Sequence, residues 1–355
     1  MTPSNPDGPR PLQLAFIGAG GVLTHHMKNL KPVPHVQAVA VADVSEGAIA
    51  WAKEQFGIPN GFTDFKRMFR EMPQIDAVCV CTPNWLHAEH SIAALEAGKH
   101  VMVEKPMALN ARDAQRMVDA AKAGGKQLVV GFQHRFEPRS RMIRRLIESG
   151  AFGRILYVRA QALRRRGITS WGVFGRKDLQ GGGPLVDVGV HMLETGHYLM
   201  GAPRPVSATA NTFCYIGDKP CEVEAPWGPW DHKTYTVEDL AVGMVRFEGG
   251  AMMTVESSFA AHIERDVMNV QVMGEKGGAN FETGQVFTDQ GGYMMTMTPA
   301  HLSETHPFEY KMRHFVEVAR GVRYNEVPPE HGLMVQKMLD AIYESAGKGR
   351  EVEVA

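Results

Sequence analysis

Short apolar runs alternate with amphipathic segments from residue 12 to residue 132. Each run has the length of a buried strand, and the segments between them place apolar side chains at helical spacing, as at Met117, Val118 and Ala121. Strands that alternate with helices in this way predict a parallel sheet covered on both faces, which is a doubly wound α/β domain. The predicted strands are Leu12–Ile17, Val36–Ala42, Asp76–Thr82, His100–Val103 and Gln127–Phe132, and helices are predicted at 45–57, at Ala88–Ala97 and after the capping residue Asn110.

The pattern changes after residue 132, where long segments with strand character replace the alternation. They predict a second, α+β domain over residues 133–355 with a large, open, mainly antiparallel sheet. Glu248-Gly249-Gly250 would join two strands in a tight hairpin, and a helix over Pro184–Met200 is inserted between strands. The sequence leaves open which domain receives the late helices Met312–Arg320 and His331–Ala346. The helix Arg139–Ser149 is followed by predicted strands at Ile155–Leu163, Val206–Ile216, Val237–Phe247, Ala251–Phe259 and Val267–Met273.

Composition is that of an ordinary globular chain, long enough for two domains: of 355 residues, 44% are hydrophobic and 22% are charged. The formal net charge of −1 indicates no surface for nucleic acid or a membrane, and no apolar run could span a bilayer. Residues 1–11, polar and rich in proline, indicate a flexible leader that is not a signal peptide.

Cys79 and Cys81 alternate on one face of a strand, which favours buried thiols over a metal or redox pair. With Cys214 and Cys221 at irregular spacing, they favour a reducing compartment, the cytoplasm.

A glycine-rich turn follows the first predicted strand, and an acid ends the second strand. The turn is Gly18-Ala19-Gly20-Gly21, next to Val22, and the acid, Asp43, comes 25 residues after Gly18. A dinucleotide needs such a turn, a helix N-terminus aimed at its pyrophosphate, and a carboxylate for its ribose. Leu23 stands where the fingerprint usually has its third glycine. Because Asp43 repels a ribose 2′-phosphate and no arginine follows it, NAD is favoured over NADP.

Lys105 lies between a buried strand and a proline, in Glu104-Lys105-Pro106. Ligands of a doubly wound sheet bind beyond the carboxyl ends of its strands, so this motif and Thr82-Pro83-Asn84 should both lie at the cleft. A lysine there can donate a hydrogen bond to a substrate hydroxyl and stabilise charge as its proton leaves. The alternative is an ordinary surface lysine ahead of a turn.

A glycine run at residues 181–183 leads into a helix that carries Asp187 and His191 four residues apart, on one face. Removal of a hydride from a secondary alcohol requires a base for the hydroxyl proton, and histidine titrates in the useful range. The carboxylate of Asp187 can orient the imidazole or bind another hydroxyl. The alternatives are a pair on a helix surface and a metal site, but no motif marks a third ligand, so no metal is expected.

Arg164-Arg165-Arg166 and three tryptophans, Trp171, Trp227 and Trp230, have the chemistry of a sugar pocket. Aromatic faces stack on sugar rings, and forked cations bind oxygen atoms. The arginines could instead bind a carboxylate or phosphate of the substrate. A solvated arginine loop and packing tryptophans are equally compatible with the sequence.

Together these motifs resemble the family of glucose–fructose oxidoreductase, inositol dehydrogenase and their MocA-type relatives (Gfo/Idh/MocA). The combination of Glu-Lys-Pro with a glycine-rich Asp-x-x-x-His helix is specific to that family. The resemblance covers nearly the whole chain, at Gly18 to Asp43, at Thr82-Pro83-Asn84 with His87, and at 97–108, 181–194, 237–241 and 274–279.

The resemblance implies an N-terminal Rossmann domain and a C-terminal domain whose open sheet forms a homodimer or homotetramer. It also implies NAD(P)-linked oxidation of a sugar or polyol hydroxyl. Within the family pattern, Lys105 binds and polarises the reacting hydroxyl, His191 is the general base, and Asp187 is a partner of the substrate and the imidazole.

The same resemblance implies roles for the loops around the cleft. Asn84 and Glu104 would line the nicotinamide side, and His87 would support that loop. The segment 164–174 resembles the branch of the family that acts on pyranosides and related sugar derivatives, with Arg164 and Trp171 as substrate contacts.

The resulting hypothesis is an NAD-dependent dehydrogenase that oxidises a ring hydroxyl of a monosaccharide, polyol or glycoside to a ketone, with Lys105 and His191 handling the proton. One alternative is a glycosidase or lyase that oxidises the sugar transiently, with no net redox change. Another is a non-catalytic NAD-binding sensor or scaffold.

Overall fold

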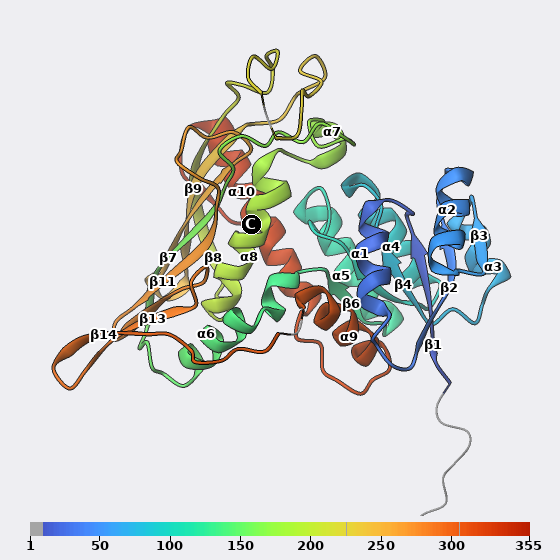
Figure 1. Cartoon of the computed structure of the whole chain (residues 1–355), viewed down its shortest axis with the longest axis horizontal. Helices are drawn as coiled ribbons and strands as arrows, with labels where there is room; N and C mark the ends of the chain where they lie inside the picture. Colours follow the sequence, from blue (N-terminus) through green and yellow to red (C-terminus); the bar gives the residue numbers. More distant parts are fainter. Residues whose placement is uncertain (1–9, 225, 305) are drawn as a thin grey trace, which may run out of the picture.

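The computed structural model describes residues 10–224, 226–304 and 306–355. It contains two sheets at opposite ends of the molecule, with helices between them (Figure 1). A leader is expected over residues 1–11, and residues 1–9 of it lie outside the described residues. Where the description begins, Arg10 already holds the carboxylate of Asp76 through two hydrogen bonds of 2.7 and 2.8 Å.

The first sheet follows the predicted alternation of strands and helices. Its strands are β1 (Leu12–Ile17), β2 (Val36–Ala42), β3 (Asn60–Phe62), β4 (Ala77–Val80), β5 (His100–Val103) and β6 (Leu128–Val130). They are all parallel, in the order β3-β2-β1-β4-β5-β6, which confirms the doubly wound domain. The prediction missed β3 and the helix after it, because three residues around Gly61 give no apolar run. The helices are α1 (Gly21–Leu30), α2 (Glu46–Phe56), α3 (Phe65–Glu71), α4 (His87–Glu96) and α5 (Ala111–Gly124), with 3₁₀ turns η1 (Asn84–Leu86) and η2 (Gln133–Phe136).

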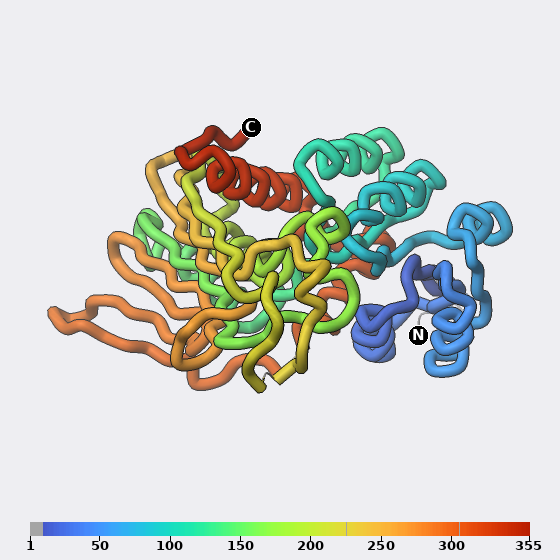
Figure 2. Tube along the Cα trace, turned by 90° about the horizontal axis from the view of Figure 1, so that it is seen from above, coloured from blue at the N-terminus to red at the C-terminus, as the bar shows by residue number. Residues whose placement is uncertain are grey.

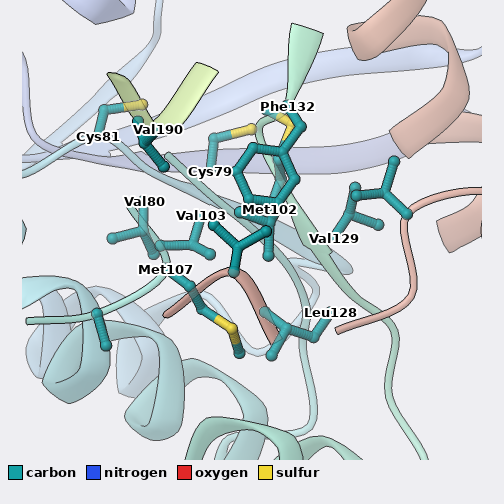
Figure 3. Close-up of a cluster of buried hydrophobic side chains, with 14 of the residues drawn as sticks. Cys79, Val80, Cys81, Met102, Val103, Met107, Leu128, Val129, Phe132 and Val190 are labelled. Carbon is teal, nitrogen blue, oxygen red and sulfur yellow. The ribbon is translucent and has the colours of Figure 1, made fainter. Parts of the chain in front are cut away.

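Apolar side chains from several strands fill the core at this sheet (Figure 3). Cys79 is fully buried and Cys81 is 9% exposed, and burial raises the pKa of both thiols. Both are free cysteines, so the prediction of buried thiols is confirmed. Val190, from the second half of the chain, lies in the same cluster, so the two halves share one continuous core.

The second sheet has nine strands, which are β7 (Ile155–Leu163), β8 (Pro205–Phe213), β9 (Leu240–Phe247), β10 (Met252–Ser258), β11 (Val267–Gly274), β12 (Gly277–Asn280), β13 (Gln285–Gln290), β14 (Tyr293–Met297) and β15 (Val352–Glu353). Their order is β14-β13-β12-β11-β7-β10-β9-β8-β15. Within this second sheet, only β7 and β10 pair in parallel among the described strands, which confirms a mainly antiparallel sheet. The hairpin turn η4 (Glu248–Gly250) joins β9 to β10 as predicted. The prediction missed β12, β13, β14 and β15, because they are glycine-containing, exposed or very short and lack a clear alternation.

The remaining helices lie between the sheets and join them. They are α6 (Pro138–Glu148), α7 (Lys177–Gln180), the π-helical turn η3 (Leu185–Gly189), α8 (Val190–Leu199), α9 (Pro307–Ala319) and α10 (Pro329–Lys348). The helix predicted over Pro184–Met200 therefore begins with a wider turn. Of the late helices, α9 packs on α1, and α10 packs on both α5 and the second sheet (Figures 1 and 2). None of the described helices combines the length and apolar character that a membrane span requires.

Candidate active site

A turn built from glycine closes the end of β1. Gly18 has φ +98°, and a Cβ there would lie 2.7 Å from the main-chain oxygen of Cys81, so conformation and space both require glycine. At Gly20 and Gly21, by contrast, a Cβ would meet open space. Because α1 begins at Gly21 and no side chain caps it, its first N–H groups are available to an anion.

Asp43, directly after β2, is tied to this turn. Its Oδ2 accepts the N–H of Ala19 at 2.7 Å, and its Oδ1 accepts the N–H of Ser45 at 2.9 Å. An uncapped helix N-terminus beside a fixed carboxylate meets the needs of a pyrophosphate and a ribose, so these residues fit a dinucleotide. Leu23, in place of the third glycine, is fully buried.

Two polar side chains hold the loop that follows β4. The ring nitrogens of His87 lie 2.8 Å from the main-chain oxygens of Thr82 and Pro106, so the ring joins this loop to the segment after β5. Asn84 donates its amide N–H to the main-chain oxygen of Gln180 in α7 at 3.0 Å. The loop is thereby fixed to both halves of the chain.

Lys105 reaches across to the π-helical turn η3. Its Nζ donates to the main-chain oxygen of Asp187 at 2.7 Å and lies 3.3 Å from Oδ1 of the same residue. Arg164, directly after β7, approaches Oδ2 of Asp187 at 3.8 Å. Arg165 instead donates to the main-chain oxygen of Glu264. Asp187 therefore lies between two cations, one from each half of the chain.

His191, at the start of α8, lies beside η2. The side-chain nitrogen of Gln133 is 3.5 Å from its Nδ1, and the ring of His134 lies edge-on at a centroid distance of 5.0 Å. Burial lowers the pKa of His191 well below its ordinary value, and the charge of Lys105 lowers it further. At neutral pH this imidazole is therefore uncharged and able to accept a proton.

Lys311 of α9, which the sequence analysis missed, lies beside Glu104. Its Nζ is 2.6 Å from Oε1 of Glu104, its side chain is fully buried, and His26 of α1 is 3.0 Å from the same oxygen. Burial alone would raise the pKa of Glu104, but its two partners outweigh burial and hold this pKa well below the ordinary range. Lys311 occupies a core-facing position of α9 with Phe315 and Val318, and a lysine in such a stripe was the available signal.

A cavity of about 1030 Å³ extends from the glycine turn to Asp187. Of the described residues predicted to contact substrate, Trp171 and Asp187 line the cavity, whereas Arg164 and His191 lie off its wall. The sequence analysis missed Trp85 and Phe174 on the wall, because no motif marks them. All the residues predicted to bind the cofactor line the cavity. They are Gly18, Gly20, Gly21, Val22, Asp43, Thr82, Pro83, Asn84, His87, Glu104 and Lys105.

The sequence left open a metal pair at Asp187 and His191. Within the described parts of the chain, no three histidine, cysteine or carboxylate side chains are grouped to hold a metal ion. Asp187 faces Lys105 and Arg164, which are cations, so its surroundings suit a carboxylate that binds donors.

The strand order, the glycine turn and Asp43 define the class of this protein, which is a dinucleotide-binding α/β protein with a second, mostly antiparallel domain. Residues 12–132 match the model of an oxidoreductase family with an NAD-binding Rossmann fold, and residues 140–280 match the GFO/IDH/MocA C-terminal domain. The chain belongs to the Gfo/Idh/MocA oxidoreductase family, as the sequence motifs predicted.

Similar proteins match over almost the whole chain. D-glucoside 3-dehydrogenase of Escherichia coli (strain K12) is 37% identical over 347 residues, which are 97% of this chain and 98% of that protein. Levoglucosan dehydrogenase of Pseudarthrobacter phenanthrenivorans is 30% identical and covers 88% of each chain. A solved structure of levoglucosan dehydrogenase in complex with NADH superposes with a TM-score of 0.82 at 27% identity, covering 98% of this chain and 100% of that one.

Proposed function

We propose that this protein is an NAD-dependent dehydrogenase that oxidises a ring hydroxyl of a sugar or glycoside to a ketone. The observation that carries the proposal is that the glycine turn and the Lys105–Asp187 pair line the same cavity. The similarity to dehydrogenases named for a glucoside and for levoglucosan supports a sugar as the substrate. In this proposal residues 12–132 bind the cofactor and residues 133–355 bind the substrate.

The side chains divide the proton chemistry between them. NAD, when bound at the turn, supplies the hydride acceptor. Lys105 donates a hydrogen bond from Nζ to the reacting hydroxyl and stabilises the charge that develops on its oxygen. His191 is uncharged at neutral pH but lies off the cavity wall, so the reacting hydroxyl must reach past the wall for this ring to accept its proton. Asp187 orients Nζ of Lys105 and accepts a hydrogen bond from a neighbouring hydroxyl.

Asp43 makes NAD the preferred cofactor over NADP. Its carboxylate stands where the adenosine ribose of a dinucleotide would lie, and Val44, Ser45 and Glu46 supply no arginine for a 2′-phosphate. A phosphate there would face the negative charge of Asp43 with no compensating cation from these residues.

The second sheet associates copies of the chain into a homodimer or homotetramer. Helices lie on one face of this sheet in Figure 1. On the face of the sheet away from the helices, the side chains of Val242, Met273 and Phe287 are each more than 40% exposed. Large apolar side chains gathered on an open sheet are typical of a surface that another protein covers.

The test is a panel of sugars, polyols and glycosides incubated with the protein and NAD, followed by NADH absorbance and by mass spectrometry of the product. We expect NADH together with a product two hydrogens lighter than the substrate. Lys105→Ala should lower kcat/KM about 100-fold or more, whereas Lys28→Ala, on the exposed side of α1, should not. Glycoside cleavage without NADH would favour redox-assisted hydrolysis, and near-normal turnover of Lys105→Ala would remove its assigned role.

A further inference from the structure

Two exposed tryptophans lie side by side where the cavity opens. Trp171 lines the cavity and is 57% exposed, and Trp227 is 36% exposed. Their ring centroids are 5.3 Å apart, with the planes tilted by 50°. Trp230 differs, because it is 6% exposed and donates its ring N–H to Gly217, as expected of a packing tryptophan. The sequence could not distinguish these cases, and the structure separates one packing tryptophan from two that face solvent.

The loop that carries Trp227 is held in place. This loop, between β8 and β9, is drawn in yellow near α7 in Figure 1. The hydroxyl of Ser170 donates to the main-chain oxygen of Trp227 at 2.7 Å. At the base of the loop, the buried carboxylate of Asp239 accepts the N–H groups of Tyr215, Ile216 and Gly217. The exposed aromatic faces are therefore held by their surroundings and available to a ligand.

Arg164 connects this aromatic pair to the site of oxidation. Its guanidinium carbon lies 4.3 Å from the ring centroid of Trp227, and its Nη2 lies 3.8 Å from Oδ2 of Asp187. Trp227 and the carboxylate of Asp187 thus both lie next to one guanidinium. A sugar ring held at Asp187 and Lys105 would place its substituent toward Trp171 and Trp227.

We infer that Trp171 and Trp227 form a subsite for the aglycone of a glycoside, a flat ring with an apolar face, beside the sugar that is oxidised. This inference rests on the proposed function and narrows its substrate from a sugar or glycoside to a glycoside. Aromatic rings and the C–H faces of pyranoses both stack on tryptophan. A phosphate or carboxylate aglycone fits less well, because Arg164 is already engaged by Asp187 and by the main-chain oxygen of Gly167 at 3.0 Å.

The experiment compares kcat/KM for phenyl β-D-glucoside, cellobiose, methyl β-D-glucoside and glucose in the full-length protein. We expect the ratio of phenyl to methyl glucoside to fall about tenfold in Trp227→Ala and to recover partly in Trp227→Phe, which keeps a ring. Cellobiose distinguishes a second sugar ring from an aryl group as the preferred aglycone. Trp51→Ala, at a tryptophan of matching exposure on α2, is the control and should leave the ratio unchanged.

An unchanged ratio in Trp227→Ala, with sugars still oxidised, would overturn the subsite and leave the proposed function standing. If no sugar is oxidised by the unaltered protein, the proposed function fails, and the subsite is then tested by tryptophan fluorescence alone. In that case, tighter binding of phenyl than of methyl glucoside, lost in Trp227→Ala, would support the subsite. Equal binding of both glucosides would overturn it.

Discussion

Asp187 accepts hydrogen bonds from Lys105 and lies 3.8 Å from the guanidinium of Arg164, and this arrangement separates the roles of the polar residues around it. A carboxylate placed between two cations suits the binding and orientation of hydrogen-bond donors. We therefore propose the uncharged imidazole of His191, and not this carboxylate, as the acceptor of the hydroxyl proton. The proposed proton transfer therefore depends on the charge states of individual side chains, which are set by burial and by neighbouring charges.

The first prediction concerns the pH dependence of turnover. Since burial and Lys105 lower the pKa of His191 well below 6.5, the active, unprotonated form persists below that pH. We expect kcat/KM at pH 6 to stay above half its value at pH 7.5, and to fall only at more acidic pH. In His134→Gln, which removes one of the charges that lower this pKa, the acid limb should move to higher pH. A midpoint at or above pH 6.5 in the unaltered protein would contradict the assignment.

The second prediction concerns cofactor choice at Asp43. In Asp43→Asn, a side-chain oxygen remains to accept the N–H of Ala19, but the charge that repels a 2′-phosphate is gone. We expect the preference for NAD over NADP, measured as a ratio of kcat/KM values, to fall about tenfold. Asp119→Asn, at an acid on the distant helix α5, provides the control. An unchanged preference for NAD in Asp43→Asn would show that residues other than Asp43 discriminate between NAD and NADP.

At the scale of the elements, α9 supplies the first half of the molecule with a buried charge. Lys311 and Glu104 form an ion pair whose lysine is fully buried, and His26 completes the contact. Loss of one member of such a pair leaves the other as an uncompensated charge in a dry interior. The pair therefore couples the stability of the first sheet to the docking of α9.

The third prediction tests that coupling in urea. Lys311→Met should lower the free energy of unfolding by about 3–5 kcal/mol at pH 7, and adding Glu104→Gln should restore part of the loss. The lysine holds the pKa of Glu104 low, so its contribution is present above the ordinary glutamate pKa and is lost as pH falls through the lowered value. The difference between Lys311→Met and the unaltered protein should therefore shrink progressively as the pH falls below the ordinary glutamate pKa. A constant difference across pH would argue against an ionic role.

The elements also show why parts of the fold were predictable and others were not. The predicted bounds of β1, β2, β5 and β7 agree with the structure, because buried strands need uninterrupted or alternating apolar side chains. β14 is exposed along its whole length and leaves no such pattern. The contact between Glu104 and Lys311 joins positions 207 residues apart, and no local spacing encodes it.

For the whole molecule, the open face of the second sheet is the feature with the largest consequence. Met273 and Phe287 lie in one row across β11, β12 and β13, on either side of Gly278. The motifs predicted the loops that carry the cavity, but the exposure of this row could be seen only once the register of the strands was known.

The fourth prediction is that the protein is oligomeric through this row. Size-exclusion chromatography with light scattering should give a dimer or tetramer, and the double variant Met273→Glu/Phe287→Glu should give a smaller species, because buried carboxylates without partners oppose association. Tyr324→Glu, an exposed position between α9 and α10, is the control. A monomer at every concentration, or an unaltered mass in the double variant, would exclude this interface.

The late position of Lys311 also bears on how the chain is made. A ribosome releases Glu104 long before the lysine that neutralises it, because 207 residues separate them. Until α9 has emerged, the first sheet must either keep this carboxylate in water or protonate it, since an unpaired charge is costly to bury. The first half therefore completes this ion pair only when synthesis is nearly finished, and a message truncated before α9 yields a product that lacks it.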